Sequence, residues 1–133
     1  MFFMKKFDQF CSYLEVLKTA KDEDLKNTFI VSGIIDKFFV QFELGWKVLK
    51  EFLRYEGRIE ASSGSPREII KAAYKAYDFL DKELWLKMLA ERNNMAHLYD
   101  EAAANELCHH IIEDYTIAFE AMKTGLQKLY FED

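Results

Sequence analysis

Hydrophobic residues recur along the chain at steps of three and four, the spacing of one face of an α-helix. Near the start, this repeat predicts a helix over about residues 2–21, on a stripe of Phe3, Phe7, Phe10, Leu14 and Leu17. The polar run KDEDLKN that follows predicts a connection. No segment has the strict alternation of a half-buried strand, so the pattern predicts an all-α protein.

The longest repeat predicts a second helix over about residues 33–56. Its stripe consists of Ile35, Phe39, Phe42, Trp46, Leu49 and Leu53. Ser32, followed by Gly33, is the candidate N-cap of this helix. Gly57 is well placed to end it, because glycine adopts the left-handed conformation that closes helices.

Three further helices are predicted from capping residues. Ser65, Pro66 and Glu68 form a capping box with proline at the first helical position, which predicts a helix over about 66–77. Asp81 caps a fourth helix and Asp100 caps a fifth, over about 101–130. The fourth has an apolar side of Leu84, Trp85, Met88 and Leu89, and the fifth a stripe of Leu107, Ile111, Tyr115, Ala118, Met122 and Leu126. The expected architecture is a bundle of about five helices, in one domain that spans residues 1–133.

Composition fits this fold and narrows the function. Half of the residues are apolar and 16% are aromatic, enough to fill a core. The net charge of -5 argues against a protein that coats nucleic acid non-specifically. Cys11 and Cys108 lack metal-ligand spacing, so we expect free thiols in a reducing compartment. The opening MFFMKKFDQF is unlike a secretory signal, and no apolar run is long enough to cross a membrane, so we expect a cytoplasmic protein.

The stretch ERNNMAHLYD, residues 91–100, contains the most chemistry. Asn93 and His97 would share a face of a continuous helix, whereas Arg92 and His97 would lie about 140° apart. Arg92, Asn93, His97 and Tyr99 therefore converge only if the helix ends near His97 or a second copy of the chain supplies the missing groups. One interpretation is ordinary helix-end chemistry. The other is a site in which an arginine holds a phosphate and a histidine moves a proton.

A basic stripe is predicted on the second helix. Lys47, Lys50, Arg54 and Arg58 follow one another at steps of three, four and four, about 100° around from the apolar stripe. Glu43 lies on the same side. The stripe is either a solvated helix face with i,i+4 ion pairs, or a surface for phosphate or for a partner protein.

Cys108, His109 and His110 are residue types that bind metal ions. Adjacent side chains on a helix, however, point about 100° apart and cannot chelate one ion together. We therefore predict no metal site here, and expect His110 to pair with Glu106 or Asp114, one turn away on either side. There is no glycine-rich phosphate loop and no serine–histidine–acid set in a recognisable context. We expect no cofactor.

Four stretches resemble one family. RNNMAHLY, from Arg92 to Tyr99, matches the arginine, four residues, histidine, any residue, tyrosine motif of HEPN domains that pair with minimal nucleotidyltransferases. FELGWKVLKEFL (residues 42–53), GSPREIIKAAY (64–74) and LWLKML (84–89) are similar to the nucleotidyltransferase substrate-binding branch and occur in the same order. The resemblance extends from about residue 30 to residue 130.

This resemblance implies an up-and-down helical bundle that forms a homodimer, with two copies of the motif at one cleft. In the wider family that cleft is a metal-independent ribonuclease site. By analogy, Arg92 would bind the scissile phosphate, His97 would act in acid–base transfer for the ribose 2′-hydroxyl, and Asn93 would support them. Tyr99 would be the acceptor of a nucleotidyl group that silences the toxin of a toxin–antitoxin pair. The alternative is a non-catalytic subunit that binds nucleotide or substrate and docks a separately encoded nucleotidyltransferase.

Overall fold

The computed structural model describes residues 4–132, apart from the side chains of Met4, Glu60, Ala96 and His97. Its helices are α1 (Met4–Lys18), α2 (Thr28–Tyr55), α3 (Pro66–Ala76), α4 (Lys82–Asn93), α5 (Glu101–His110) and α6 (Thr116–Tyr130). Short 3-10 turns η1 (Thr19–Asp22), η2 (Ile59–Ala61) and η3 (Met95–Tyr99), and a π turn η4 (Ile111–Tyr115), lie between them. Residues 4–132 contain no strand, so the all-α prediction is confirmed.

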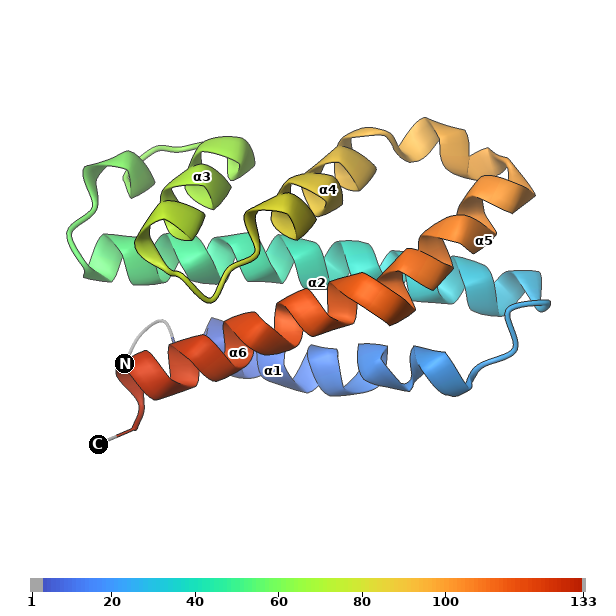
Figure 1. The fold of residues 1–133 in the computed structure, drawn as a ribbon, viewed down its shortest axis with the longest axis horizontal. Helices are drawn as coiled ribbons and strands as arrows, with labels where there is room; N and C mark the ends of the chain where they lie inside the picture. The colour runs from blue at the N-terminus through green and yellow to red at the C-terminus, as the bar shows by residue number, and fades with distance from the viewer. Residues whose placement is uncertain (1–3, 133) are drawn as a thin grey trace.

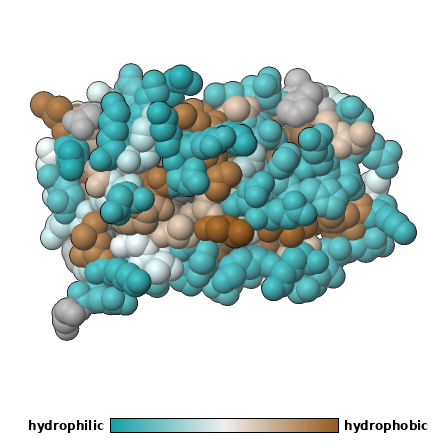
Figure 2. All heavy atoms as spheres, in the orientation of Figure 1, coloured by the Kyte–Doolittle hydropathy of each residue, from teal (hydrophilic) through white to brown (hydrophobic). Residues whose placement is uncertain are grey.

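The long helix α2 runs through the centre of the bundle (Figure 1). In the view of Figure 1, α3 and α4 lie above it and α1 and α6 below it. Helix α1 packs along α2 and against α6, while α3 packs against α2 and α4. On the face shown in Figure 2, hydrophobic residues form a band across the middle, between hydrophilic residues above and below. Nowhere in residues 4–132 is a helix both long and apolar enough to cross a membrane.

Aromatic rings hold the bundle together at its centre. Trp85 of α4 is fully buried, and its ring centroid lies 6.1 Å from that of Phe42 and 5.7 Å from that of Phe119. Phe10 of α1 contacts Phe119 from the other side, at 5.9 Å. Gly45 makes room for these rings, because a β-carbon there would lie 3.2 Å from the Trp85 ring. Full burial of one such side chain contributes about 1.5–3 kcal/mol, so this cluster fixes how α1, α2, α4 and α6 pack.

The start of α2 differs from the prediction. The helix begins at Thr28, five residues before Gly33, and its N-cap is Asn27 rather than Ser32. The Asn27 side chain accepts hydrogen bonds from the backbone N–H groups of Phe29 and Ile30, at 3.0 and 3.3 Å. Asparagine is as good an N-cap as serine, and the extra turn buries Val31, so the longer helix is favoured.

The predicted end of α2 is confirmed. Gly57 has φ of +75°, a conformation that costs other residues energy. The Gly57 N–H donates to the Arg54 carbonyl and the Arg58 N–H to the Leu53 carbonyl, both at 2.9 Å. These two bonds form a Schellman motif, which stops the helix at Tyr55.

The other predicted helices are present, with changes at their ends. Ser65, Asp81 and Asp100 each accept a backbone N–H as N-caps of α3, α4 and α5. The first helix ends at Lys18 and continues as η1. Phe3, predicted as part of its apolar stripe, lies outside the described residues. The segment predicted as one helix over 101–130 is helical throughout, but is α5, η4 and α6 in succession. Leu107, Ile111 and Tyr115 are spaced four residues apart, slightly more than one turn of an α-helix, so in a regular α-helix each would lie further around the helix than the one before. The π turn has more residues per turn, and all three side chains are buried.

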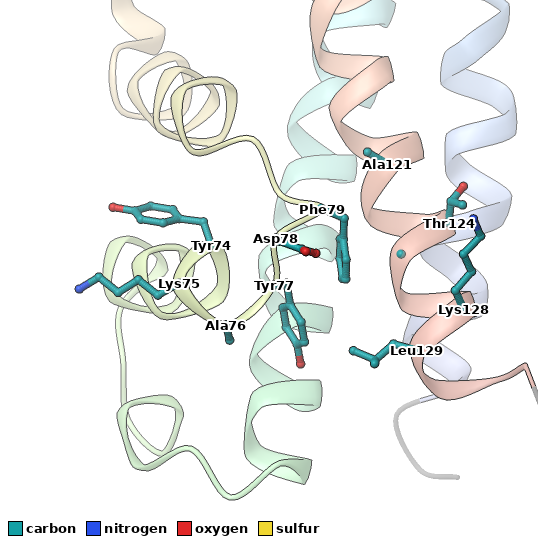
Figure 3. Close-up of a pocket in the computed structure, with 11 residues that line it drawn as sticks. Tyr74, Lys75, Ala76, Tyr77, Asp78, Phe79, Ala121, Thr124, Lys128 and Leu129 are labelled. Carbon is teal, nitrogen blue, oxygen red and sulfur yellow. The ribbon is translucent and has the colours of Figure 1, made fainter.

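The connection from α3 to α4 is bound closely to α6 (Figure 3). The Tyr77 and Tyr130 hydroxyls are 2.8 Å apart and hydrogen-bonded. Phe79 stacks on Tyr77, with ring centroids 5.2 Å apart, and lies against Gly125, where a β-carbon would collide with its ring. Leu80 is buried in the same connection. Packing alone therefore accounts for the apolar residues of this segment.

Candidate functional site

Helix α4 carries the candidate site at its C-terminal end. Its buried side, with Trp85, Met88 and Leu89, packs into the core, which leaves Arg92 half-buried in the last turn. The helix ends at Asn93, four residues earlier than the predicted end near His97. Two consecutive asparagines are poor helix formers, and the Asn94 N–H turns back to the Glu91 carbonyl at 3.2 Å. Asn93 and His97 therefore do not share a face of one continuous α-helix.

Arg92 is bound to α2 through Glu43. Its Nε donates to Glu43 Oε1 at 3.0 Å, and its Nη1 donates to Asn93 Oδ1 at 3.3 Å. The second carboxylate oxygen, Glu43 Oε2, accepts from the indole Nε1 of Trp46 at 2.9 Å. The Arg92 and Glu43 side chains are 36% and 33% exposed, so the pair lies at the surface with water on one side.

The basic stripe only partly follows the helix. Lys47, Lys50 and Arg54 lie on α2, but Arg58 comes after the Schellman turn and lines a cavity with Tyr77 and Tyr130. The predicted four-residue stripe is therefore wrong at Arg58. Lys47 Nζ lies 5.9 Å from the centroid of the Trp46 ring, whose indole N–H donates to Glu43.

Two motif residues follow in η3. The backbone of His97 lies in this turn, but its side chain is outside what the structure describes, so its proton-transfer role stays a prediction. Tyr99 is 97% exposed, which leaves its hydroxyl open to another macromolecule. Asp100 then caps α5 by accepting the Ala102 N–H at 3.0 Å.

The residues set aside as metal ligands have other contacts. His110 Nε2 lies 3.6 Å from Glu106 Oε1 and His110 Nδ1 lies 3.6 Å from Asp114 Oδ2, so the predicted pairing of His110 is confirmed on both sides. The Cys108 thiol is buried and contacts the Val31 carbonyl at 3.6 Å. Burial raises the pKa of Cys108 to about 11, and burial is also the largest cause that raises the pKa of Cys11 to about 11. Both thiols are therefore protonated and unreactive near neutral pH.

A cavity of about 820 Å³ lies away from this site, between the α3–α4 connection and α6 (Figure 3). Tyr77, Phe79 and Leu129 face into it, whereas the Lys75 side chain points away. Neither Arg92 nor Tyr99 is among its lining residues. Its lining includes the polar side chains of Asp78, Thr124 and Lys128, and none of the residues predicted for the candidate site.

Sequence reasoning missed the role of Glu43 and Trp46. It placed Glu43 among the basic residues of α2 and Trp46 in the apolar stripe, whereas Trp46 is only half-buried and binds Glu43. Their three-residue spacing was a signal, because it places both side chains on neighbouring turns of one helix. No local pattern could reveal the contact with Arg92, which lies 49 residues beyond Glu43.

Comparison with known proteins now places the chain in a family. The search of curated proteins finds no match. A family model described as nucleotidyltransferase substrate binding protein like matches residues 4–128, a range that includes all six α-helices except the last residues of α6. The matched range contains Glu43, Trp46, Arg92 and Tyr99. The chain therefore belongs to the nucleotidyltransferase substrate binding protein-like family.

Proposed function

We propose that this protein is the HEPN-type toxin of a toxin–antitoxin pair, a metal-independent ribonuclease that a separately encoded minimal nucleotidyltransferase silences. Membership of a nucleotidyltransferase substrate-binding family supports the partner. The observation that carries the ribonuclease role is the placement of Arg92, held by Glu43 at the surface and five residues before His97. We further propose that residues 1–133 act as one domain, in the cytoplasm.

The proposed chemistry needs a cation and a proton carrier. Arg92 binds the scissile phosphate through N–H donors that Glu43 and Asn93 leave free, in the forked geometry that suits phosphate oxygens. His97 takes the proton of the ribose 2′-hydroxyl as its oxygen attacks phosphorus. The bond to the 5′-oxygen breaks, and this oxygen takes a proton from protonated His97 or from water, so the products are a 2′,3′-cyclic phosphate and a 5′-hydroxyl. No metal is required for this balance.

A second copy of the chain completes the proposed site. The Arg92 side chain is 36% exposed, and a site of this kind needs a wall that excludes water. Met95, three residues after Arg92, is 53% exposed, which gives a second chain an apolar contact there. A homodimer would bring two sets of Arg92 and His97 to one cleft.

Tyr99 is the proposed acceptor of the silencing group. Its phenolic oxygen attacks the α-phosphorus of a nucleoside triphosphate held by the transferase, pyrophosphate leaves, and the phenolic proton passes to water. Near-complete exposure of Tyr99 supports this role, because the active site of a second enzyme has to surround the hydroxyl. The added phosphodiester would place negative charge near Arg92 and obstruct RNA.

The test is RNA cleavage by purified protein in the presence of a chelator. We expect cyclic phosphate ends with wild-type protein, and a rate lowered by roughly 100-fold or more with Arg92→Ala or His97→Ala. Arg67→Ala is the matched control, because it removes the same charge from the exposed start of α3. Equal cleavage by wild-type protein and by both site variants would exclude a nuclease role for the motif.

A non-catalytic binding subunit is the second candidate. The net charge of -5, together with a carboxylate beside Arg92, weakens the attraction of a long RNA and favours a small nucleotide or a protein partner. In this case the chain docks a nucleotidyltransferase through α2 and performs no chemistry. Co-purification with the transferase, with affinity lost on changing Lys47, Arg54 or Arg92, distinguishes this candidate from a nuclease that acts alone.

A further inference from the structure

Both oxygens of the Glu43 carboxylate are used, one by each of two helices. Oε1 accepts from Arg92 of α4 and Oε2 accepts from Trp46 of α2, at 3.0 and 2.9 Å. The indole N–H is rigidly attached to its ring and donates from one turn further along the same helix. The carboxylate therefore cannot rotate without losing one of two hydrogen bonds, so its direction is fixed relative to α2.

The fixed carboxylate decides how the Arg92 guanidinium is presented. A guanidinium has five N–H donors in one plane, and Glu43 takes the Nε donor near its base. Asn93 takes one donor of Nη1, and Nη2 has no partner within the described part of the chain. The outer end of the fork, formed by Nη1 and Nη2, is the end that binds two oxygens of a phosphate. Glu43 thus occupies the inner edge and leaves the phosphate-binding edge available.

Stability alone gives a poor account of this arrangement. An ion pair with both side chains about one-third exposed contributes little to folding, because water screens the charges and two long side chains lose freedom. A negative charge beside Arg92 also weakens its attraction for phosphate in simple electrostatic terms. The small contribution to stability and the weaker attraction for phosphate are both explained if the Glu43–Arg92 pair serves to fix the direction of the Arg92 guanidinium. We propose that Glu43, fixed by Trp46, is a positioning residue that aims Arg92 at the reacting phosphate.

This assignment rests on the proposed ribonuclease function, and the two can fail separately. Positioning makes an unusual prediction for Glu43→Ala: the kcat for RNA cleavage falls about tenfold or more, while the Kd for a non-cleavable 2′-O-methyl RNA stays the same or decreases. The variant removes the negative charge of Glu43, which repels the phosphates of RNA, so we expect no increase in the Kd. Trp46→Phe keeps the ring but removes the N–H, so we expect a smaller fall in kcat, by a few-fold.

A double-mutant cycle separates positioning from general damage. In an Arg92→Ala background, Glu43→Ala has nothing left to aim, so it should cause no further loss of kcat. Glu120→Ala is the matched control, since the Lys18–Glu120 pair between α1 and α6 is similarly exposed, at 39% and 41%. This control should leave kcat unchanged. Thermal unfolding of each variant verifies that it is folded. If Glu43→Ala does not fold, the kcat of Trp46→Phe tests the positioning role instead.

Three results overturn the assignment. If Arg92→Ala abolishes cleavage but Glu43→Ala leaves kcat unchanged or increases it, Glu43 does not aim Arg92 and only this inference fails. The same holds if Glu43→Ala lowers kcat equally with and without Arg92, because its effect is then purely structural. If wild-type protein cleaves no RNA, or Arg92→Ala cleaves normally, the proposed function fails and the positioning role with it.

Discussion

The two connections that flank α4 have opposite characters. The connection before the helix, residues 77–81, buries Tyr77 and Leu80 and is attached to α6 by the Tyr77–Tyr130 hydrogen bond and by Phe79 against Gly125. The connection after it, residues 94–100, includes the exposed side chains of Met95 and Tyr99. One helix therefore begins in a packed segment and ends in an open one.

This difference supports the proposed site at the end of α4. Every apolar side chain described in the first connection has a partner that explains it, so packing is sufficient. In the second, an almost fully exposed tyrosine follows an arginine that is ion-paired across to another helix, and packing explains neither. Exposed groups on a segment fixed by a rigid scaffold are the usual form of a functional loop. The contrast predicts that changes before α4 affect stability and changes after it affect function.

The largest effect on stability is expected at Leu80. Leu80 is 6% exposed, and truncation to alanine leaves a cavity, so Leu80→Ala should lower the free energy of unfolding by about 2–5 kcal/mol. Met95→Ala is the matched change in the other connection, and should alter the free energy of unfolding of the single chain by less than about 0.5 kcal/mol. Urea unfolding at pH 7 measures both. Equal losses would show that the connection after α4 is also a packed element.

A smaller effect is expected from the Tyr77–Tyr130 hydrogen bond. Tyr77→Phe removes this hydrogen bond to the Tyr130 hydroxyl, and should cost about 0.5–1.5 kcal/mol at pH 7. Phe at both positions removes donor and acceptor together, so the double variant should lose less than the sum of the two single variants. Additive losses would contradict a shared hydrogen bond.

The same pair gives stability a dependence on alkaline pH. Burial is the largest cause that raises the pKa of both Tyr77 and Tyr130 above the ordinary value of 10.0. Above pH 10 the unfolded chain therefore loses phenolic protons that the folded chain keeps, so stability falls as pH rises. The fall is at most about 1.4 kcal/mol per pH unit for each phenol, and less for the half-buried Tyr130 because water screens it. Unfolding of the Tyr77→Phe/Tyr130→Phe variant at pH 7 and pH 11 should show a shallower fall than wild-type protein.

Local patterns were enough to predict the helices. Helix ends are set by residues that act within one turn of the chain, so they can be recognised from the sequence alone. These residues are the N-caps Ser65, Asp81 and Asp100 and the closing Gly57. The start of α2 was wrong because two acceptable caps, Asn27 and Ser32, compete, and burial of Val31 decides between them. The end of α4 was wrong because the cap of the next helix fixes where that helix starts, not where the previous one stops.

The candidate site could be predicted only in part. The residues of RNNMAHLY stand out by type and spacing, but the contact that orients Arg92 comes from Glu43, on another helix. Such a contact depends on how α2 and α4 pack around Trp85, which no local pattern specifies. Arg58 shows the opposite error: its spacing continued a helical stripe, but the left-handed Gly57 had already turned the chain away.

The smallest effect on stability, and the sharpest on function, is expected at Tyr99. Its side chain is 97% exposed, so Tyr99→Phe should change the free energy of unfolding by less than about 0.5 kcal/mol. If its hydroxyl is the acceptor, the same change abolishes transfer of a labelled nucleotide from ATP by a cognate minimal nucleotidyltransferase, because phenylalanine has no oxygen to attack phosphorus. The Tyr55→Phe variant, changed at a tyrosine that is 59% exposed at the end of α2, should be labelled as fully as wild-type protein. Label retained on the Tyr99→Phe protein would place the acceptor elsewhere, and the open connection after α4 would then serve RNA or the transferase as a binding surface only.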